Sequence, residues 1–480
     1  MLGLAFPFAD AGIVSFIALV PLFLLWSKSS WKQALCWGWL SGVILSLILF
    51  HWMINSIGDF IGSWSLLALA LLCLYQGAFV ALAAVVSALA GRGEFRAICV
   101  VAIPGAWLLF ENVRTRGSWG LPFGELGLGA AHLPWLLPLA AYGGVYLVSG
   151  VVALVNGALA AIVAGTPEAR RAAALVLPIA AVIIASAAIA RHQVALPPAS
   201  LRVAVAQGAI SQREKWTPAV FERTLATYSA LTRQAAARGA RVVIWPETAV
   251  TSYPLQEPWL LERLEGIAST SGVWILAGTI DRPSEDGYYN AMLELTPTGT
   301  VGGVYHKRML VPFAEFLPLD GLLRPLPLFD AASRFVAGPG PHLLGAAGWQ
   351  FGTLICYESA FAPYARATAN AGADALIVAT DDAWFGGTTG PDQHADIAVV
   401  TAVATGRWIA QHRQIPLTDT FSYTAAGTEW IYPVLSQLLL YFGYALGGYA
   451  LLSWASAAAC VGTIALLLRR CSPRAIRGWP

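Results

Sequence analysis

The stretch FGTLICYES, residues 351–359, decides how the middle of this chain is interpreted. Its first five residues are typical of the end of a buried β-strand, and Cys356, Tyr357 and Glu358 follow at once. In layered α/β domains, chemistry gathers where strands end. A thiol placed there beside a carboxylate is therefore a candidate nucleophile.

Alternating strand and helix patterns surround this stretch from about residue 201 to 432, where most of the Asp and Glu residues lie. Strands are predicted over residues 201–207, 241–245, 273–278, 289–296, 300–305, 351–355 and 375–380. Helices are predicted over 218–238, 258–269, 359–371 and 394–405. This alternation predicts one soluble α/β domain.

The rest of the chain is far more apolar. Of all 480 residues, 57% are hydrophobic and only 12% are charged. Uncharged runs cover 11–26, 33–50, 65–90, 97–110, 136–164, 172–190 and 445–468, and a spanning helix needs about 20 apolar residues. We expect a membrane bundle over 1–195 with about seven helices, the first truncated. We expect it to be followed by the soluble domain over 199–433, a closing membrane helix over 445–469 and a basic tail over 470–480.

Positive charge gathers in particular connections between the apolar runs. Pairs of Lys or Arg lie at residues 28 and 32, 92 and 96, and 170 and 171, and four Arg lie between residues 469 and 477. The loop at 114–116 runs against this count. The positive-inside rule assigns these connections to the cytoplasm and the soluble domain to the opposite face. The net charge of +2 gives no support for nucleic-acid binding.

Three polar residues follow predicted strands: Glu247, Lys307 and Cys356. Taken singly, each has an ordinary alternative as a turn carboxylate, a solvated lysine or a core thiol. Cys356 is the only one of six cysteines in the predicted soluble domain, so it has no disulfide partner there. Together the three could supply a base, an oxyanion-holding cation that favours the thiolate, and a nucleophile.

Four ordered strings resemble motifs of the carbon–nitrogen hydrolase, or nitrilase, superfamily: IWPETAV (244–250), YHKRMLVPFAEFLP (305–318), LICYESAF (354–361) and DDAWFG (381–386). The resemblance implies an αββα sandwich with a Glu–Lys–Cys triad. The matching positions are Glu247, Lys307 and Cys356. No cofactor is implied, and the sequence offers no metal site because the His residues are scattered.

The membrane segments around this domain make the chain similar to the apolipoprotein N-acyltransferase family. Membrane strings such as IALVPLFLLW (17–26) and ENVRTRGSWGLPFGELG (111–127) also resemble it. The resemblance implies acyl transfer from a phospholipid to the N-terminal amine of a diacylglyceryl-cysteine lipoprotein, through a cysteine thioester. It implies a monomer in a bacterial inner membrane, with the catalytic domain facing the periplasm.

Further positions match family motifs and are expected to support the triad: Glu315, Tyr357, Glu358, Trp216, Asn290 and Trp384. Asn290 and Trp384 are expected to support the site rather than to react, and each of the other four has an alternative. Glu315 could make only a loop hydrogen bond, and Tyr357 with Glu358 could be a packed aromatic and a helix cap. Trp216 could contact lipid or substrate, or could be an interfacial anchor.

Departures from the family pattern keep other functions open. The family usually has Asn where Asp381 stands and Gly where Ala314 stands. The segment over 401–430 diverges, with only Gly406 and Arg407 of its helix matching well. A divergent acyltransferase with another acceptor and a membrane-anchored amidase share the same triad. A scaffold or transporter with a degenerate domain is the third alternative, and the intact triad positions argue against it.

Overall fold

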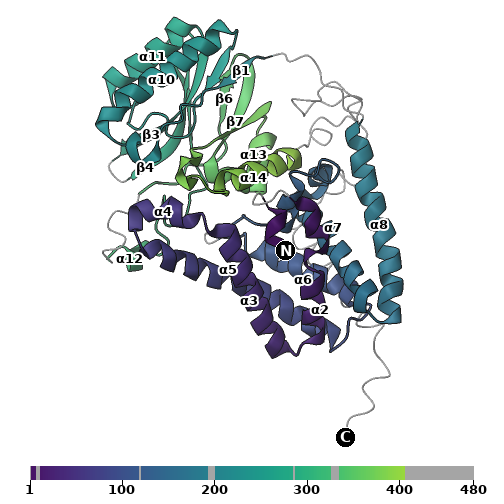
Figure 1. The fold of residues 1–480 in the computed structure, drawn as a ribbon. Coiled ribbons are helices and arrows are strands. Elements are labelled where there is room, and N and C mark those ends of the chain that lie inside the picture. The colour runs from purple at the N-terminus through teal and green to yellow at the C-terminus, as the bar shows by residue number, and fades with distance from the viewer. Residues whose placement is uncertain are drawn as a thin grey trace.

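The computed structural model describes residues 2–6, 11–117, 120–192, 201–284, 287–325 and 334–405. A helical bundle forms one end of the molecule and an α/β domain the other (Figure 1). The predicted membrane helix over 445–469 and the tail over 470–480 lie outside the described residues. The same holds for the predicted soluble domain beyond residue 405.

Among the described residues, four helices are long and apolar enough to cross a membrane. They are α3 (Trp31–Phe50), α5 (Trp64–Gly91), α7 (Ala140–Ala164) and α8 (Pro167–His192). Shorter elements complete the bundle: η1 (Leu2–Ala5), η2 (Gly12–Val14), α1 (Ser15–Ala18), α2 (Val20–Lys28), α4 (Met53–Ile61), α6 (Cys99–Val113), η3 (Leu126–Ala130) and η4 (Leu137–Leu139). The six apolar runs that lie within the described residues fall on these helices.

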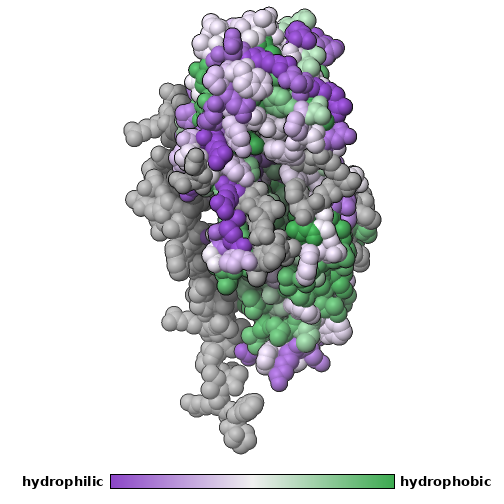
Figure 2. Space-filling view, turned by 90° about the vertical axis from the view of Figure 1, so that its left-hand side faces the viewer, coloured by the Kyte–Doolittle hydropathy of each residue, from purple (hydrophilic) through white to green (hydrophobic). Residues whose placement is uncertain are grey.

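Small residues let α3 and α5 approach closely. A Cβ added at Gly42 would lie 2.8 Å from the Cα of Gly77, so the two backbones almost touch. Small residues at such crossings are typical of helix pairs in membranes. Large apolar side chains such as Ile44 and Leu71 face outward, and Figure 2 shows an apolar surface over the bundle. Exposed apolar surface of this kind suits lipid.

The α/β domain contains two sheets. The first has the order β1-β2-β3-β4-β5, from β1 (Val203–Val205), β2 (Val242–Ile244), β3 (Trp274–Ser284), β4 (Gly287–Leu295) and β5 (Val301–His306). The second has the order β6-β7-β8, from β6 (Leu343–Ala346), β7 (Trp349–Ile355) and β8 (Ala375–Ala379). Strands β1, β2 and β3 pair in parallel, as do β7 and β8.

Alternation along the strands produces the layers. Val242 and Ile244 belong to a core that also contains Phe351 and Ile355 of the second sheet, so these residues lie between the sheets. Val243 belongs to a different core, shared with α10 (Pro218–Ala237) and α11 (Pro258–Ser271). Successive strand residues face opposite sides. Helices α13 (Ala362–Asn370) and α14 (Gly390–Ala404) lie below the second sheet (Figure 1), which completes the predicted αββα sandwich.

The structure differs from the sequence expectation after Cys356. The predicted helix over 359–371 is split into the 3₁₀-helix η6 (Cys356–Ala360) and α13, which has Pro363 in its first turn. Proline favours the start of a helix because its ring fixes φ and lacks an N–H. Strand β6 and the short helix α9 (Gln212–Lys215) were not predicted.

Helices α13 and α14 place the α/β domain on the end of the bundle (Figure 1). Helix α14 packs against α7. The side chain of Gln393 donates to the carbonyl oxygen of Leu49 at 3.1 Å, and Trp52 meets Phe385 edge to face. These contacts put the turn that carries Cys356 directly above the bundle.

Candidate active site

Cys356 lies where β7 ends and η6 begins. Its φ of 50° is in the left-handed region, which non-glycine residues rarely adopt. Such backbone strain persists where surrounding structure fixes the residue, and it clusters at active sites. The residue is partly exposed, so the sharp turn presents the sulfur to the open side of the strand ends.

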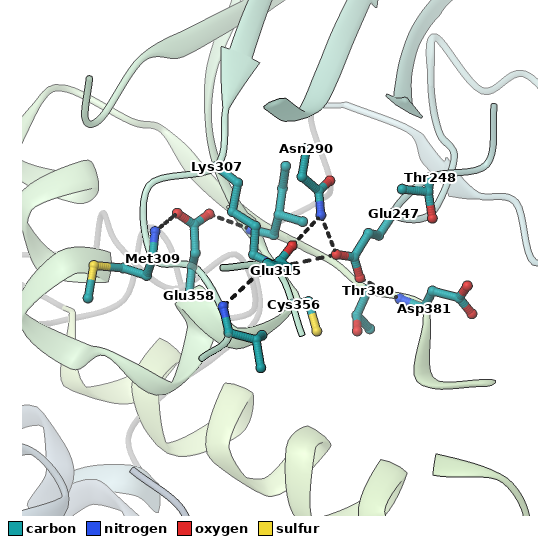
Figure 3. A network of polar contacts seen from close by, with 12 residues as sticks. Glu247, Thr248, Asn290, Lys307, Met309, Glu315, Cys356, Glu358, Thr380 and Asp381 are labelled. Atoms are coloured by element: carbon teal, nitrogen blue, oxygen red, sulfur yellow. Dashed lines mark hydrogen bonds and ion pairs between the residues drawn. The ribbon is translucent and has the colours of Figure 1, made fainter. Parts of the chain in front are cut away.

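Glu247 follows β2 and Lys307 follows β5, and both are buried. Lys307 Nζ donates to Glu247 Oε1 at 3.3 Å. The Cys356 side chain points into the same space (Figure 3). The structure therefore brings together the three positions predicted from the sequence.

Glu315 and Asn290 join the carboxylate of Glu247 to the lysine (Figure 3). Lys307 Nζ donates to Glu315 Oε1 at 2.9 Å. Asn290 Nδ2 donates to Glu247 at 2.7 Å and to Glu315 at 3.0 Å. Among the described residues, two of the three Lys307 ammonium protons are thus used. One remains for an oxyanion.

Glu358 connects the nucleophile turn to the chain that follows Lys307. Its Oε1 accepts from the backbone N–H groups of Arg308 and Met309 at 2.7 and 3.0 Å. Its Oε2 accepts from the N–H of Ile355 and the hydroxyl of Tyr305, both at 2.7 Å. Glu358 therefore caps η6, which was the structural alternative for this residue. It also fixes the turn that carries Cys356 to the chain that follows Lys307.

Burial and neighbouring charges shift the pKa values of Glu247 and Lys307 in opposite directions. Burial raises the pKa of Glu247, but Lys307 and the Asn290 amide outweigh it, and the net pKa is lowered. Burial lowers the pKa of Lys307, but Glu315 and Glu247 outweigh it, and the net pKa is raised. Both groups are therefore charged near neutral pH.

The pKa of the Cys356 thiol is set by opposing influences from its surroundings. Burial and the negative charge of Glu247 raise the pKa of Cys356 well above its usual value, although Lys307 and a hydrogen bond with Thr380 lower it. Lys307 thus favours the thiolate, as expected from the sequence, but burial of the thiol and the charge of Glu247 outweigh it. The resting sulfur is a neutral thiol, so its proton must be removed during reaction.

The remaining predicted residues lie around this centre. Tyr357 is buried and its hydroxyl donates to the carbonyl oxygen of Gly120 in the bundle at 2.7 Å. Trp216 follows α9 and is 45% exposed, as a lipid- or substrate-contacting residue requires. Trp384 lies in η7 (Asp382–Phe385) and is partly buried. No cluster within the described ranges could hold a metal ion.

Comparison with known proteins decides the family. Residues 202–420 match the carbon–nitrogen hydrolase family and residues 1–158 match the apolipoprotein N-acyltransferase N-terminal domain. The chain is 32% identical to the apolipoprotein N-acyltransferase of Azotobacter vinelandii over 90% of this chain and 85% of the relative. The chain belongs to the apolipoprotein N-acyltransferase family. It is thus an acyltransferase of lipoprotein maturation with a membrane context and a lipid or lipoprotein substrate.

Other relatives agree. The apolipoprotein N-acyltransferase of Pseudomonas syringae pv. tomato is 33% identical over 79% of this chain and 76% of the relative. That of Geobacter metallireducens is 31% identical over 84% and 80%. Among solved structures, a carbon–nitrogen hydrolase from Helicobacter pylori matches 42% of this chain and 69% of its own, at 18% identity and a TM-score of 0.32.

Sequence reasoning missed three residues around the centre of this acyltransferase. Lys215 is buried beside Glu247, and its only signal was its place before Trp216. Asp381 was noted only as a departure from the family pattern, yet its N–H donates to Glu247 Oε2 at 3.1 Å. His394 lies between Asp382 Oδ1 at 2.8 Å and the carbonyl oxygen of Cys356 at 3.0 Å, where it steadies the nucleophile turn.

Proposed function

We propose that this protein transfers an acyl chain from a phospholipid to the N-terminal amine of a diacylglyceryl-cysteine lipoprotein, through a thioester on Cys356. One observation carries the proposal most directly. A buried, charged Glu247–Lys307 pair lies beside the thiol of the half-buried residue Cys356, at the end of a membrane bundle. Family membership adds the acceptor class.

In the first half-reaction, Glu247 takes the thiol proton as Sγ of Cys356 attacks the ester carbonyl carbon of the phospholipid. The carbonyl oxygen becomes an oxyanion, and the remaining ammonium N–H of Lys307 donates a hydrogen bond to it. The ester C–O bond then breaks. The leaving alkoxide takes the proton from Glu247 and departs as a lysophospholipid, and the thioester remains.

In the second half-reaction, the lipoprotein amine attacks the thioester carbonyl carbon. Glu247 takes a proton from the amine, and Lys307 again holds the oxyanion. The C–S bond breaks, and the sulfur regains its proton from Glu247. The products are an amide and the original thiol. At the start and at the end of each half-reaction, Glu247 is ionised and Lys307 is protonated.

The molecular arrangement supports lipid substrates. Both substrates are held in a bilayer, so a site on the end of the bundle meets them without leaving the membrane surface. The positive connections of the bundle support an orientation with that end at the periplasmic face of a bacterial inner membrane. Trp216, exposed beside Lys215, is placed to contact an arriving lipid. Trp384 supports the site from η7. We expect the protein to act as a monomer.

Purified protein mixed with phospholipid and a synthetic diacylglyceryl-cysteine peptide tests this function. The peptide should gain the mass of one acyl chain at its N-terminal amine, and Cys356→Ala should abolish the gain. Release of free fatty acid with an unmodified peptide would contradict the proposal and favour a hydrolase. Turnover of small soluble amides in place of lipids would identify a membrane-anchored amidase.

A further inference from the structure

A second buried lysine lies next to the base. Lys215, from α9, is 5% exposed. Its Nζ donates to Asp381 Oδ2 at 2.5 Å, to Thr248 Oγ1 at 2.7 Å and to the carbonyl oxygen of Glu247 at 3.2 Å. An ammonium group has three protons, and each has an acceptor here.

Asp381 closes a ring around Glu247. Its carboxylate accepts from Lys215, and its own backbone N–H donates to Glu247 Oε2 at 3.1 Å. The same pair therefore holds Glu247 at its main chain and at its carboxylate. The ring joins three segments that are distant in sequence: α9, the loop after β2 and the loop after β8.

The backbone of the loop after β2 needs this support. Thr248 has a φ of 47°, in the left-handed region that is unfavourable for a β-branched residue. Such a conformation is energetically unfavourable and persists where neighbouring groups fix it. The bonds from Lys215 to the hydroxyl of Thr248 and to the carbonyl of Glu247 fix this turn.

We propose that Lys215 and Asp381 are positioning residues that hold Glu247 in place as the base, and that the charge of Asp381 offsets the charge of Lys215 beside it. This inference rests on the proposed function. Neither side chain reaches the reacting atoms in this account. They act through the orientation of Glu247 and through the electrostatic field in which Glu247 accepts a proton.

The sign of the electrostatic effect follows from the charges around the carboxylate. Lys215 and the backbone N–H of Asp381 stabilise the ionised form of Glu247, whereas the negative charges of the Asp381 and Glu247 carboxylates repel each other. Replacing Asp381 by Asn leaves an acceptor for Lys215 but removes the offsetting charge, so Glu247 becomes a weaker base. Other titratable groups near Glu247 are Lys307, Glu315, Cys356 and His394.

The test measures the rate at which Cys356 gains an acyl chain from phospholipid, by quenched intact-mass spectrometry between about pH 4 and about pH 8. Asp381→Asn should slow this step about tenfold near neutral pH, because a weaker base gives a slower proton transfer. Lys215→Met should move the acid limb of the rate profile up toward the ordinary glutamate pKa of about 4.3.

The matched control is Arg223→Met, which removes an ion pair between Arg223 and Glu214 on the exposed side of the α9 region. Its rate and pH profile should equal those of the wild type. The inference is overturned if Asp381→Asn is as fast as the wild type, and this variant decides alone where Lys215→Met does not fold. A wild type that gains no acyl chain would instead contradict the proposed function.

Discussion

At the scale of single residues, the thiol of Cys356 is neutral at rest because burial and Glu247 raise its pKa. We therefore predict that alkylation of Cys356 by iodoacetamide keeps accelerating with pH above about 8.5, the usual thiol pKa. The sign follows because a raised pKa moves thiolate formation to higher pH. The rate is measured by peptide mass spectrometry, with glutathione in the same buffer as the control.

A plateau of that alkylation rate already reached below neutral pH, well before the glutathione plateau, would show that the resting site holds a thiolate. Glu247 would then be unnecessary as the base for the first proton transfer. The positive charge of Lys307 would then outweigh burial and Glu247 in setting the pKa of the Cys356 thiol.

Glu358 provides a second test at this scale. Its two oxygens accept four hydrogen bonds. Glu358→Gln replaces one carboxylate oxygen by an NH2 group, which faces hydrogen-bond donors. Buried N–H or O–H groups therefore lose their acceptor. We expect a loss of about 2–4 kcal/mol in the free energy of unfolding and slow acylation of Cys356. Thermal unfolding measures the first effect. Glu222→Gln, on the exposed side of α10, is the control and should change neither.

At the scale of elements, the sequence predicted most strands and helices of the α/β domain because their apolar residues follow periods of two or of 3.6. It missed β6 because LLGA over residues 343–346 is too short to show a period. It gave the positions of Glu247, Lys307 and Cys356 through the strands that precede them. Lys215 was missed because α9 is a single turn, and only the fold brings it to Glu247.

The α3–α5 pair gives a prediction at this scale. A Cβ at Gly42 would lie 2.8 Å from Gly77 Cα, whereas a Cβ at Gly105 in α6 would meet nothing within 4 Å. Gly42→Ala should therefore destabilise the bundle by about 1–3 kcal/mol through overpacking. Gly105→Ala, the matched control, should not. Equal thermal unfolding temperatures for the two variants in detergent would contradict the close crossing.

At the scale of the whole molecule, the bundle is part of the active site's support. Phe123, from the loop after α6, stacks on Tyr357 and contacts Trp52 and His394 through its ring. The nucleophile turn therefore lies on an aromatic layer supplied partly by the bundle. Removing a ring from that layer should displace the backbone turn that carries Cys356.

We predict that Phe123→Ala slows acylation of Cys356 by more than about tenfold, because it leaves a cavity under the turn. Phe79→Ala is the control, since Phe79 lies in α5 and pairs with Tyr75 there. The acyl adduct formed over time is measured for both. A wild-type rate in Phe123→Ala would show that the α/β domain holds its nucleophile without the bundle.

The most direct test of the central claim is the intact mass of the purified protein after mixing with phospholipid alone. The wild type should gain the mass of one acyl chain, hydroxylamine should remove it, and Cys356→Ala should gain nothing. A folded wild type that gains no mass, or an equal gain in Cys356→Ala, would contradict a thioester on Cys356.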